Sequence, residues 1–93
     1  MYYVYILGSP NNKVLYVGFT TDLLRRVYEH KQGRVLGFTK KYHVTKLLYF
    51  EAGEGYDGVL SREKQIKKYS RFKKEQLILS LNPSKKELYY ELE

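Results

Sequence analysis

Residues 3–30 read YVYILGSPNNKVLYVGFTTDLLRRVYEH, and this stretch decides how the rest of the chain can fold. Two runs within and beside it, residues 2–7 and 14–19, are rich in the β-branched and aromatic residues that strands prefer. The residues between them, GSPNN at 8–12, are of the types that form turns. The pattern therefore predicts an antiparallel β-hairpin at the start of the chain.

The register of this hairpin decides which side chains share a face of the sheet. With the turn centred on residues 10–11, we expect Tyr5 directly opposite Tyr16, on the face that also carries Tyr3 and Gly18. A slip of one residue would send the two tyrosines to opposite faces. The other face is expected to pack through the aliphatic residues Val4, Ile6, Leu15 and Val17.

A helix is predicted directly after the hairpin. Residues 20–22, TTD, are N-cap and first-turn types, and residues 23–31 repeat their apolar side chains with helical period. The apolar residues of this helix would pack beneath the sheet. Arg26 and His30 are four residues apart, so they are expected on one side of the helix.

The rest of the chain is expected to add one strand and three helices. In order, we expect a basic loop with one short helical turn at 33–43, a strand at 44–51, and helices from 56 or 57 to 69, 72 to 81 and 85 to 92. Ser84 and Glu87 would form a capping box for the last helix. The helix at 72–81 is expected to bury Phe72, Leu77, Ile78 and Leu81.

These elements predict a fold of the α/β (α+β) class, with a three-stranded antiparallel sheet flanked by helices. A chain of 93 residues is the size of one domain. We expect residues 1–82 to form that domain and residues 83–93 to pack on it as a short C-terminal helix.

Composition limits the function classes. The chain has 17 Lys and Arg against 10 Asp and Glu, a net charge of +7, which suits a polyanionic partner but also suits a basic surface without a ligand. It has no cysteine, which excludes disulfides and thiolate metal sites. With the first strand starting near Met1 and no apolar run of membrane-spanning length, we expect a soluble protein of the cytoplasm that meets no membrane.

Glu63 is the most informative single residue. It falls on the apolar side of the helix that begins at 56 or 57, while Lys64, Lys67 and Lys68 are expected on the opposite side. A carboxylate on an inward face is normally paired, protonated or bound to a metal. The sequence therefore leaves open an ion pair or a metal-binding role.

Together these residues resemble the GIY-YIG nuclease domain. Tyr3-Val4-Tyr5 stands for its first signature and Tyr16-Val17-Gly18 for its second, with Arg26, His30 and Glu63 at the positions of further functional residues. The resemblance covers about residues 2–78 and is closest to small, stand-alone bacterial members. The chain departs from the family at Tyr3, which replaces glycine, at Phe19, where some relatives have lysine, and at 73–75, where some have asparagine.

The resemblance implies an endonuclease that hydrolyses phosphodiester bonds in nucleic acid with Mg²⁺ or Mn²⁺. Glu63 would ligate one ion, completed by substrate phosphate, because Mg²⁺ keeps most of its waters. Arg26, rather than its neighbour Arg25, would face the scissile phosphate. Tyr16 would act as base or position the water, and Tyr5 would support it by hydrogen bonding.

The resemblance also gives His30 a role, as the group that accepts a proton or orients the tyrosine. Its imidazole titrates in the neutral range unaided. The alternative is a surface histidine at the end of a helix, where a cation is favoured in any protein.

The basic residues predict the nucleic-acid interface. Such residues bind phosphates without reading bases, so recognition of structure rather than of sequence is expected, in DNA more than RNA, with repair or recombination as the setting. Two alternatives stay open: a non-catalytic nucleic-acid-binding module, and an interaction domain that meets a protein partner through Tyr89 and Tyr90. We expect a monomer. The residues expected to contact nucleic acid are Arg25, Lys31, Arg34, Lys40, Lys41, Lys64, Lys67, Lys68 and Arg71.

Overall fold

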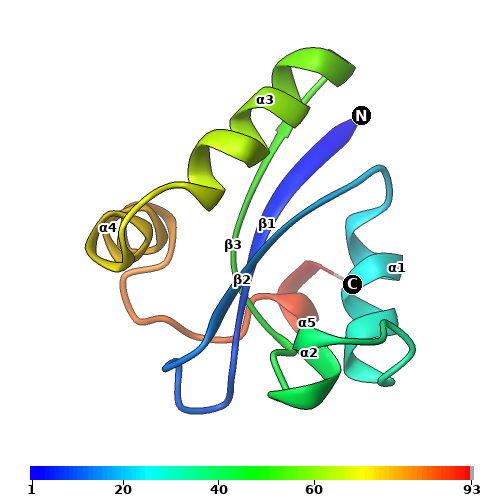
Figure 1. The fold of residues 1–93 in the computed structure, drawn as a ribbon, viewed down its shortest axis with the longest axis vertical. Coiled ribbons are helices and arrows are strands. Elements are labelled where there is room, and N and C mark those ends of the chain that lie inside the picture. Colours follow the sequence, from blue (N-terminus) through cyan, green and yellow to red (C-terminus); the bar gives the residue numbers. More distant parts are fainter. Residues whose placement is uncertain (93) are drawn as a thin grey trace.

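A three-stranded antiparallel sheet organises the protein, whose computed structural model describes residues 1–92 (Figure 1). The strands are β1 (Tyr2–Gly8), β2 (Leu15–Thr20) and β3 (Lys46–Gly53), in the order β2-β1-β3. The central strand is therefore the first one in the chain, and β2 is an edge strand. The predicted α+β fold with this sheet is confirmed.

The register of the hairpin differs from the expected one. Tyr5 pairs with Gly18 and Leu7 pairs with Tyr16, so the predicted pairing of Tyr5 with Tyr16 is wrong by two residues. Because side chains alternate with a period of two, a shift of two residues leaves both tyrosines on one face.

The loop explains the shift. Ser9 and Val14 close it, with the Ser9 N–H donating to the Val14 carbonyl at 2.9 Å. The Ser9 hydroxyl donates to the Asn11 side chain at 2.8 Å, and Asn12 adopts a φ of 59°, a left-handed conformation that asparagine tolerates. These local bonds centre the turn one residue later than expected.

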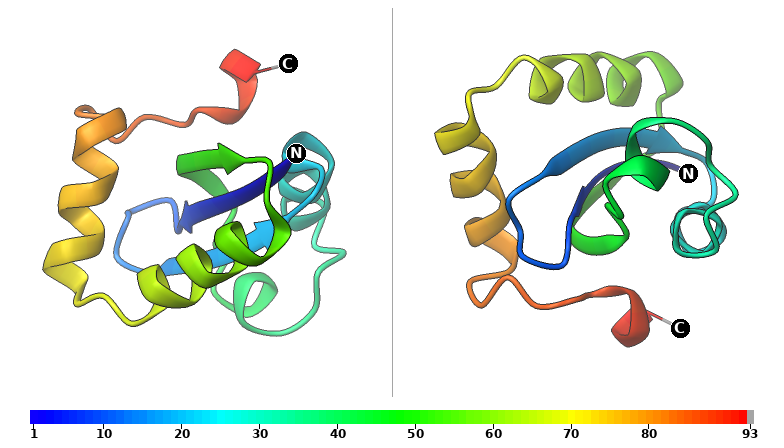
Figure 2. Two further views of the ribbon diagram at one scale, coloured as in Figure 1. Left: turned by 90° about the horizontal axis from the view of Figure 1, so that it is seen from above. Right: turned by 60° about the horizontal axis from the view of Figure 1, so that its bottom comes forward.

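Helices cover both faces of the sheet (Figure 2). The face with Val4, Ile6 and Val17 packs against α3 (Tyr56–Lys67) and α4 (Arg71–Leu81). The face with Tyr5 and Leu7 packs against α1 (Leu23–Lys31) and α5 (Tyr89–Leu92), and the single turn α2 (Phe38–Lys41) lies beside it. The tyrosine face is thus as well covered as the aliphatic one.

The start of α1 is fixed by short-range bonds. Asp22 is its N-cap and accepts a hydrogen bond from the Arg25 N–H at 3.2 Å, as predicted for residues of this type. The Thr20 hydroxyl accepts from the Asp22 N–H at 3.1 Å, which joins the end of β2 to the helix. This short connection sets the direction in which Arg26 leaves the helix.

Two details of the later helices differ from expectation. Ser70 caps α4 by accepting from the Lys73 N–H, so α3 ends at Lys67 rather than at residue 69. Phe72 and Leu81, expected inside, are 71% and 47% exposed. Phe72 lies six residues from the buried Ile78, a spacing that puts the two on different sides of a helix.

The C-terminal segment is mostly irregular, and the helix expected at 85–92 is only the four-residue α5. The predicted capping box is wrong because Glu87 has other partners. Its carboxylate accepts from the Leu47 N–H at 2.6 Å and pairs with Lys31. The segment is therefore tied to β3 and α1. No helix within residues 1–92 has the length and apolar character to cross a membrane.

Candidate active site

Gly18 makes room for the tyrosine at the centre of the site. A Cβ atom at this position would collide with the ring and the hydroxyl of Tyr5, its cross-strand partner. The Tyr5 side chain therefore lies directly across the backbone of β2, where any larger residue would displace it. This contact gives a physical reason for the glycine of the second signature.

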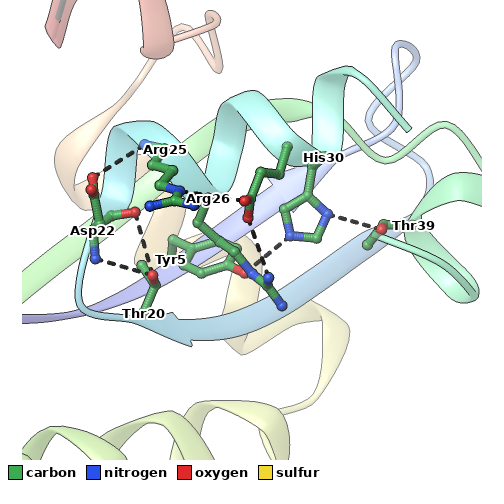
Figure 3. A network of polar contacts seen from close by, with 8 residues as sticks. Tyr5, Thr20, Asp22, Arg25, Arg26, His30 and Thr39 are labelled. Atoms are coloured by element: carbon green, nitrogen blue, oxygen red, sulfur yellow. Dashed lines mark hydrogen bonds and ion pairs between the residues drawn. The ribbon is translucent and has the colours of Figure 1, made fainter. Parts of the chain in front are cut away.

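Three buried side chains form a hydrogen-bonded chain that starts at this tyrosine (Figure 3). The Tyr5 hydroxyl lies 3.1 Å from His30 Nε2, and His30 Nδ1 lies 2.9 Å from the Thr39 hydroxyl. The exposed fractions of the three residues are 1%, 2% and 2%. The chain connects β1, α1 and α2 through a polar path inside the protein.

The environment of His30 rules out the surface histidine that the sequence left open. Burial, assisted by the positive charge of Arg26, lowers the pKa of His30 to about 4. The imidazole is therefore neutral at neutral pH, and the expected titration in that range does not occur. It acts as a hydrogen-bonding group rather than as a cation.

Arg26 lies where the chain of hydrogen bonds meets solvent. Its guanidinium interacts with the Tyr5 hydroxyl, which raises the pKa of Arg26. Its side chain is 39% exposed, and it also makes a long contact of 3.5 Å with Glu29. Arg25 is 76% exposed and reaches Glu29 but not Tyr5. The structure thus brings Arg26, and not Arg25, to the tyrosine.

An open groove of about 560 Å³ runs past Arg26. It is lined by the end of β2 and the first turns of α1, and the guanidinium of Arg26 forms part of its wall. Its lining residues are Phe19, Thr20, Thr21, Asp22, Arg25, Arg26 and Glu29.

The two signature tyrosines differ in their surroundings. Burial raises the pKa of Tyr5 to about 12, against the opposing effect of Arg26, so this phenol is protonated at neutral pH. Tyr16 is only partly buried, and its ring lies 5.6 Å from that of His30 and 6.4 Å from that of Phe38. No group within residues 1–92 hydrogen-bonds to its hydroxyl. Tyr16 therefore keeps a hydroxyl free for a ligand or water.

Glu63 is 6% exposed, as its position on the apolar side of the helix predicted. Its carboxylate pairs with Lys67 Nζ at 2.6 Å, so Lys67 does not lie on the opposite side of the helix as expected. A spacing of four residues brings both to one side. Burial is the main cause of the raised pKa of Tyr5, and the negative charge of Glu63 makes only a small addition to it.

The donor set at Glu63 suits a hard divalent ion that is mainly bound by water and phosphate. Residues 1–92 contain no group of three or more His, Cys, Asp and Glu able to enclose a metal. Among residues 1–92, the Lys67 ammonium, whose side chain is 51% exposed, is the one group that forms an ion pair with the Glu63 carboxylate. One carboxylate with a displaceable cation fits Mg²⁺ or Mn²⁺ and not a protein cage.

The residues predicted to contact nucleic acid divide into those that link other parts of the protein and those that do not. Lys31 is 15% exposed and bound to Glu87 and to the Thr45 carbonyl, while Arg71 donates to the carbonyls of Asn12 and Lys13. These two residues, and Lys67 through its ion pair with Glu63, are therefore engaged in contacts within the protein. The remaining residues of the predicted set are exposed and do not link distant segments: Arg25, Arg34, Lys40, Lys41, Lys64 and Lys68.

Sequence reasoning missed two residues of α2 that lie against the site. The Thr39 hydroxyl is hydrogen-bonded to His30 Nδ1, and Phe38, which is 47% exposed, stacks on Tyr16. Nothing in the pattern of the loop 33–43 singles out Thr39. The one available signal is that Phe38 is an apolar residue next to basic ones in a loop, which is typical of nucleic-acid surfaces.

Comparison with known proteins identifies the family of the chain. The family model for the GIY-YIG catalytic domain matches residues 1–76. A UPF0213 protein of Haloquadratum walsbyi is 42% identical over 76 residues, which cover 82% of this chain and 84% of that protein. A UPF0213 protein of Clostridium perfringens is 42% identical over 93 residues, 100% of this chain and 97% of that one.

A solved structure supports the fold. The solution NMR structure of a UPF0213 protein from Bacillus halodurans has a TM-score of 0.58 and 32% identity, with 90% of this chain and 89% of that chain covered. The resemblance that the signatures suggested is therefore confirmed, and the protein belongs to the GIY-YIG catalytic domain family.

Proposed function

We propose that the protein is an endonuclease that hydrolyses phosphodiester bonds with the help of Mg²⁺ or Mn²⁺. Membership of a nuclease domain family supports this reaction class, and the nucleases of this family typically use a divalent metal. The observation that carries the proposal is that the buried side chains of Tyr5 and His30, 3.1 Å apart at their polar atoms, lie beside Arg26, which lines an open groove.

Arg26 is the residue proposed to hold the scissile phosphate. It lines the open groove, is always charged, and its long contact with Glu29 leaves donors available. A guanidinium can bind two phosphate oxygens at once and stabilise the charge that grows on them in the transition state.

Tyr16 is proposed as the base or as the group that positions the attacking water. Its hydroxyl is not used inside the protein, whereas that of Tyr5 is engaged by His30. Tyr5, with a pKa of about 12, supports the site by hydrogen bonding. His30 is neutral and assists by orienting Tyr5.

Glu63 is the residue proposed to hold the metal. When bound, the ion would neutralise charge on phosphate oxygens and lower the pKa of a coordinated water. The protein's own contribution is to place one carboxylate beside the site and to release Lys67, which is exposed enough to turn into solvent.

The substrate is proposed to be DNA recognised by structure, in repair or recombination. The exposed basic residues of α1, α2 and α3 would contact phosphates, which carry no sequence information. We propose that the protein works as a monomer, and that a protein partner supplies further specificity.

A plasmid-nicking assay tests the proposed function. We expect Glu63→Gln to lower the nicking rate by at least about a hundredfold, since it removes the carboxylate proposed to hold the metal. Glu54→Gln is the matched control, because Glu54 is exposed at the turn before α3. Nicking that survives in Glu63→Gln, or in EDTA, would contradict the assignment.

A second candidate is a nucleic-acid-binding module without catalysis. The ion pair of Glu63 with Lys67 favours it, because it satisfies the carboxylate with no metal. Tight, salt-sensitive DNA binding with no cleavage in Mg²⁺ or Mn²⁺ would support this candidate over the nuclease.

A further inference from the structure

Three aromatic side chains, Tyr16, Phe38 and Tyr42, form a continuous row that runs outward from the candidate site. The ring of Tyr16 stacks with that of Phe38, with 6.4 Å between the centroids and 27° between the planes. The ring of Tyr42 lies 5.0 Å from that of Phe38. At the inner end of the row, the Tyr16 ring lies 5.6 Å from that of the buried His30. This aromatic row therefore connects the site with the surface.

The two outer rings of the row are exposed because of how α2 is anchored. Phe38 and Tyr42 are four residues apart, so they lie on one side of this single turn, and their exposed fractions are 47% and 44%. Thr39, between them, is buried and bonded to His30, and its carbonyl accepts from the Val44 N–H at 2.9 Å. The two rings therefore present aromatic surface to solvent from a fixed position.

Positive charge surrounds this aromatic surface. Lys40 and Lys41 are exposed on the same turn, and Lys41 Nζ lies 5.3 Å from the centre of the Tyr42 ring. Beyond Tyr42, an open hollow of about 410 Å³, which Lys13 also lines, lies between the end of α2 and the β1–β2 loop, at one end of the molecule (Figure 1). Residues 30–50 contain five Lys and Arg and no Asp or Glu. The charge around the row thus suits a polyanion.

Exposed rings beside cations are the features with which proteins bind single-stranded nucleic acid. The bases stack on the rings, and the cations contact the backbone. In a duplex, both faces of a base are covered by its neighbours, so only an unpaired, unstacked base can offer a face to an aromatic side chain. The aromatic row therefore suits an unpaired strand better than a duplex.

We propose that the aromatic row is a stacking platform for the unpaired bases of a DNA strand that runs from the site across α2. Phe38 and Tyr42 stack with bases, and Lys40 and Lys41 contact the phosphates of the same strand. The structure recognised in DNA is then a single-stranded segment next to the cleaved bond. This last step rests on the proposed nuclease function, whereas the binding of unpaired bases does not.

A single tryptophan can report the stacking directly, since the chain has none of its own. We expect the fluorescence of Phe38→Trp, measured in EDTA, to be quenched by an oligothymidylate of about 12 nucleotides. An abasic oligonucleotide of the same length, which has the phosphates without the bases, should not quench it. Phe72→Trp is the matched control, because Phe72 is 71% exposed beside Arg71 and Lys73 on α4, at the other face of the sheet.

Three results of the quenching experiment would overturn the proposal. These are an unquenched Phe38→Trp, equal quenching by the abasic oligonucleotide, and equal quenching of Phe72→Trp. The first of them would favour a protein partner for this surface.

Affinities measured by fluorescence anisotropy show how much the ring contributes. Phe38→Leu keeps an apolar side chain but removes the ring, so we expect the Kd for the oligothymidylate to rise about tenfold. The Kd values for the abasic oligonucleotide and for a duplex should change little, and Phe72→Leu should change none of the three. A Phe38→Leu variant that weakens all three equally, or none of them, contradicts the platform.

The binding measurements and the plasmid-nicking assay can fail independently. A protein that binds the oligothymidylate through Phe38 but does not nick contradicts the nuclease and supports the platform. A protein that nicks, but whose Phe38→Leu variant binds like the wild type, contradicts the platform alone. If the Phe38 variants do not fold, the wild-type affinities still decide, because the platform requires the oligothymidylate to bind at least about tenfold more tightly than the abasic oligonucleotide.

Discussion

The two faces of the sheet are equally buried but have different chemistry. The face under α3 and α4 is closed mainly by aliphatic side chains such as Ile6, Ile66 and Ile78, which stabilise the fold by burial. The face under α1 also buries a phenol, an imidazole and a hydroxyl, and these remain inside only because they bond to one another. The α1 side thus carries Tyr5, Arg26 and His30, whereas Glu63, the proposed metal ligand, comes from α3.

The arginines show the same contrast. Arg62 on α3 binds Glu51 at 2.7 Å and donates further to Gln65 and Tyr69, so its donors are used within the protein. Within residues 1–92, Arg26 on α1 has only the long contact with Glu29 and its interaction with Tyr5. The guanidinium of Arg62 stabilises the fold, whereas that of Arg26 retains N–H donors that a ligand can use.

Exchanging these arginines for alanine is the strongest way to test that contrast. We expect Arg26→Ala to lower nicking by about a hundredfold to a thousandfold, as loss of a transition-state donor does, with little change in the melting temperature. Arg62→Ala should cost about 1 to 3 kcal/mol of folding free energy and leave nicking largely intact. Thermal melts and nicking rates, measured on both variants, check this. If both lose only stability, Arg26 has no role at the phosphate.

Gly18→Ala should act on the tyrosine face alone. The new Cβ would collide with Tyr5, so we expect loss of about 1 to 3 kcal/mol of stability and a marked loss of nicking. Gly55→Ala is the matched control, because nothing lies within 4 Å of a Cβ there and its φ of −90° suits alanine. Denaturant unfolding measures the change in folding free energy. A fully stable and active Gly18→Ala would mean that Tyr5 does not need its position across β2.

Acid should weaken the tyrosine face through His30. The unfolded chain protonates this histidine near its usual pKa of about 6.5, whereas the folded protein protonates it only at about 4. The stability that this difference provides is complete above about pH 6.5 and is lost as pH falls toward 4, on the order of 3 kcal/mol in total.

Urea unfolding at several pH values measures that loss. His30→Asn should flatten the fall in stability between pH 6.5 and 4, while His43→Asn, at an exposed residue, should keep it. An identical pH dependence in His30→Asn and in the wild type would show that His30 is not held neutral.

The smallest expected effect concerns the exposed lysines. Lys40→Gln should weaken DNA binding modestly and lower the slope of log K against log salt by about one, because it removes one phosphate contact. Lys31→Gln should leave that slope unchanged, since Lys31 is committed to Glu87. Fluorescence anisotropy over a range of salt concentrations checks both. A lower slope in Lys31→Gln would show that the C-terminal segment releases this lysine when DNA binds.

Periodicity predicted the sheet, α1 and the inward position of Glu63, because each depends on the spacing of apolar residues. It could not predict the hairpin register, which depends on the left-handed Asn12 and the bonds of Ser9. It also could not predict that Phe72 is exposed or that Glu87 pairs with Lys31, since both follow from how distant segments meet.

The sequence identified the candidate residues of the site, but not the hydrogen bonds between them. The family spacing identified Tyr5, Arg26, His30 and Glu63 as candidates, and the first three of these interact with one another in the structure. The burial of His30 and its bond to Thr39 come from a loop whose sequence shows no regular pattern. A hydrogen bond between residues nine positions apart in such a loop leaves no periodic signal.

The ammonium of Lys67 neutralises the buried Glu63 carboxylate without a metal ion. A carboxylate held in the interior without a counter-charge would strain the fold whenever the ion is absent. With its own cation four residues away, Glu63 is neutralised from the moment α3 forms. If Glu63 holds a metal ion as proposed, the ion has only to displace a lysine side chain that is itself half exposed.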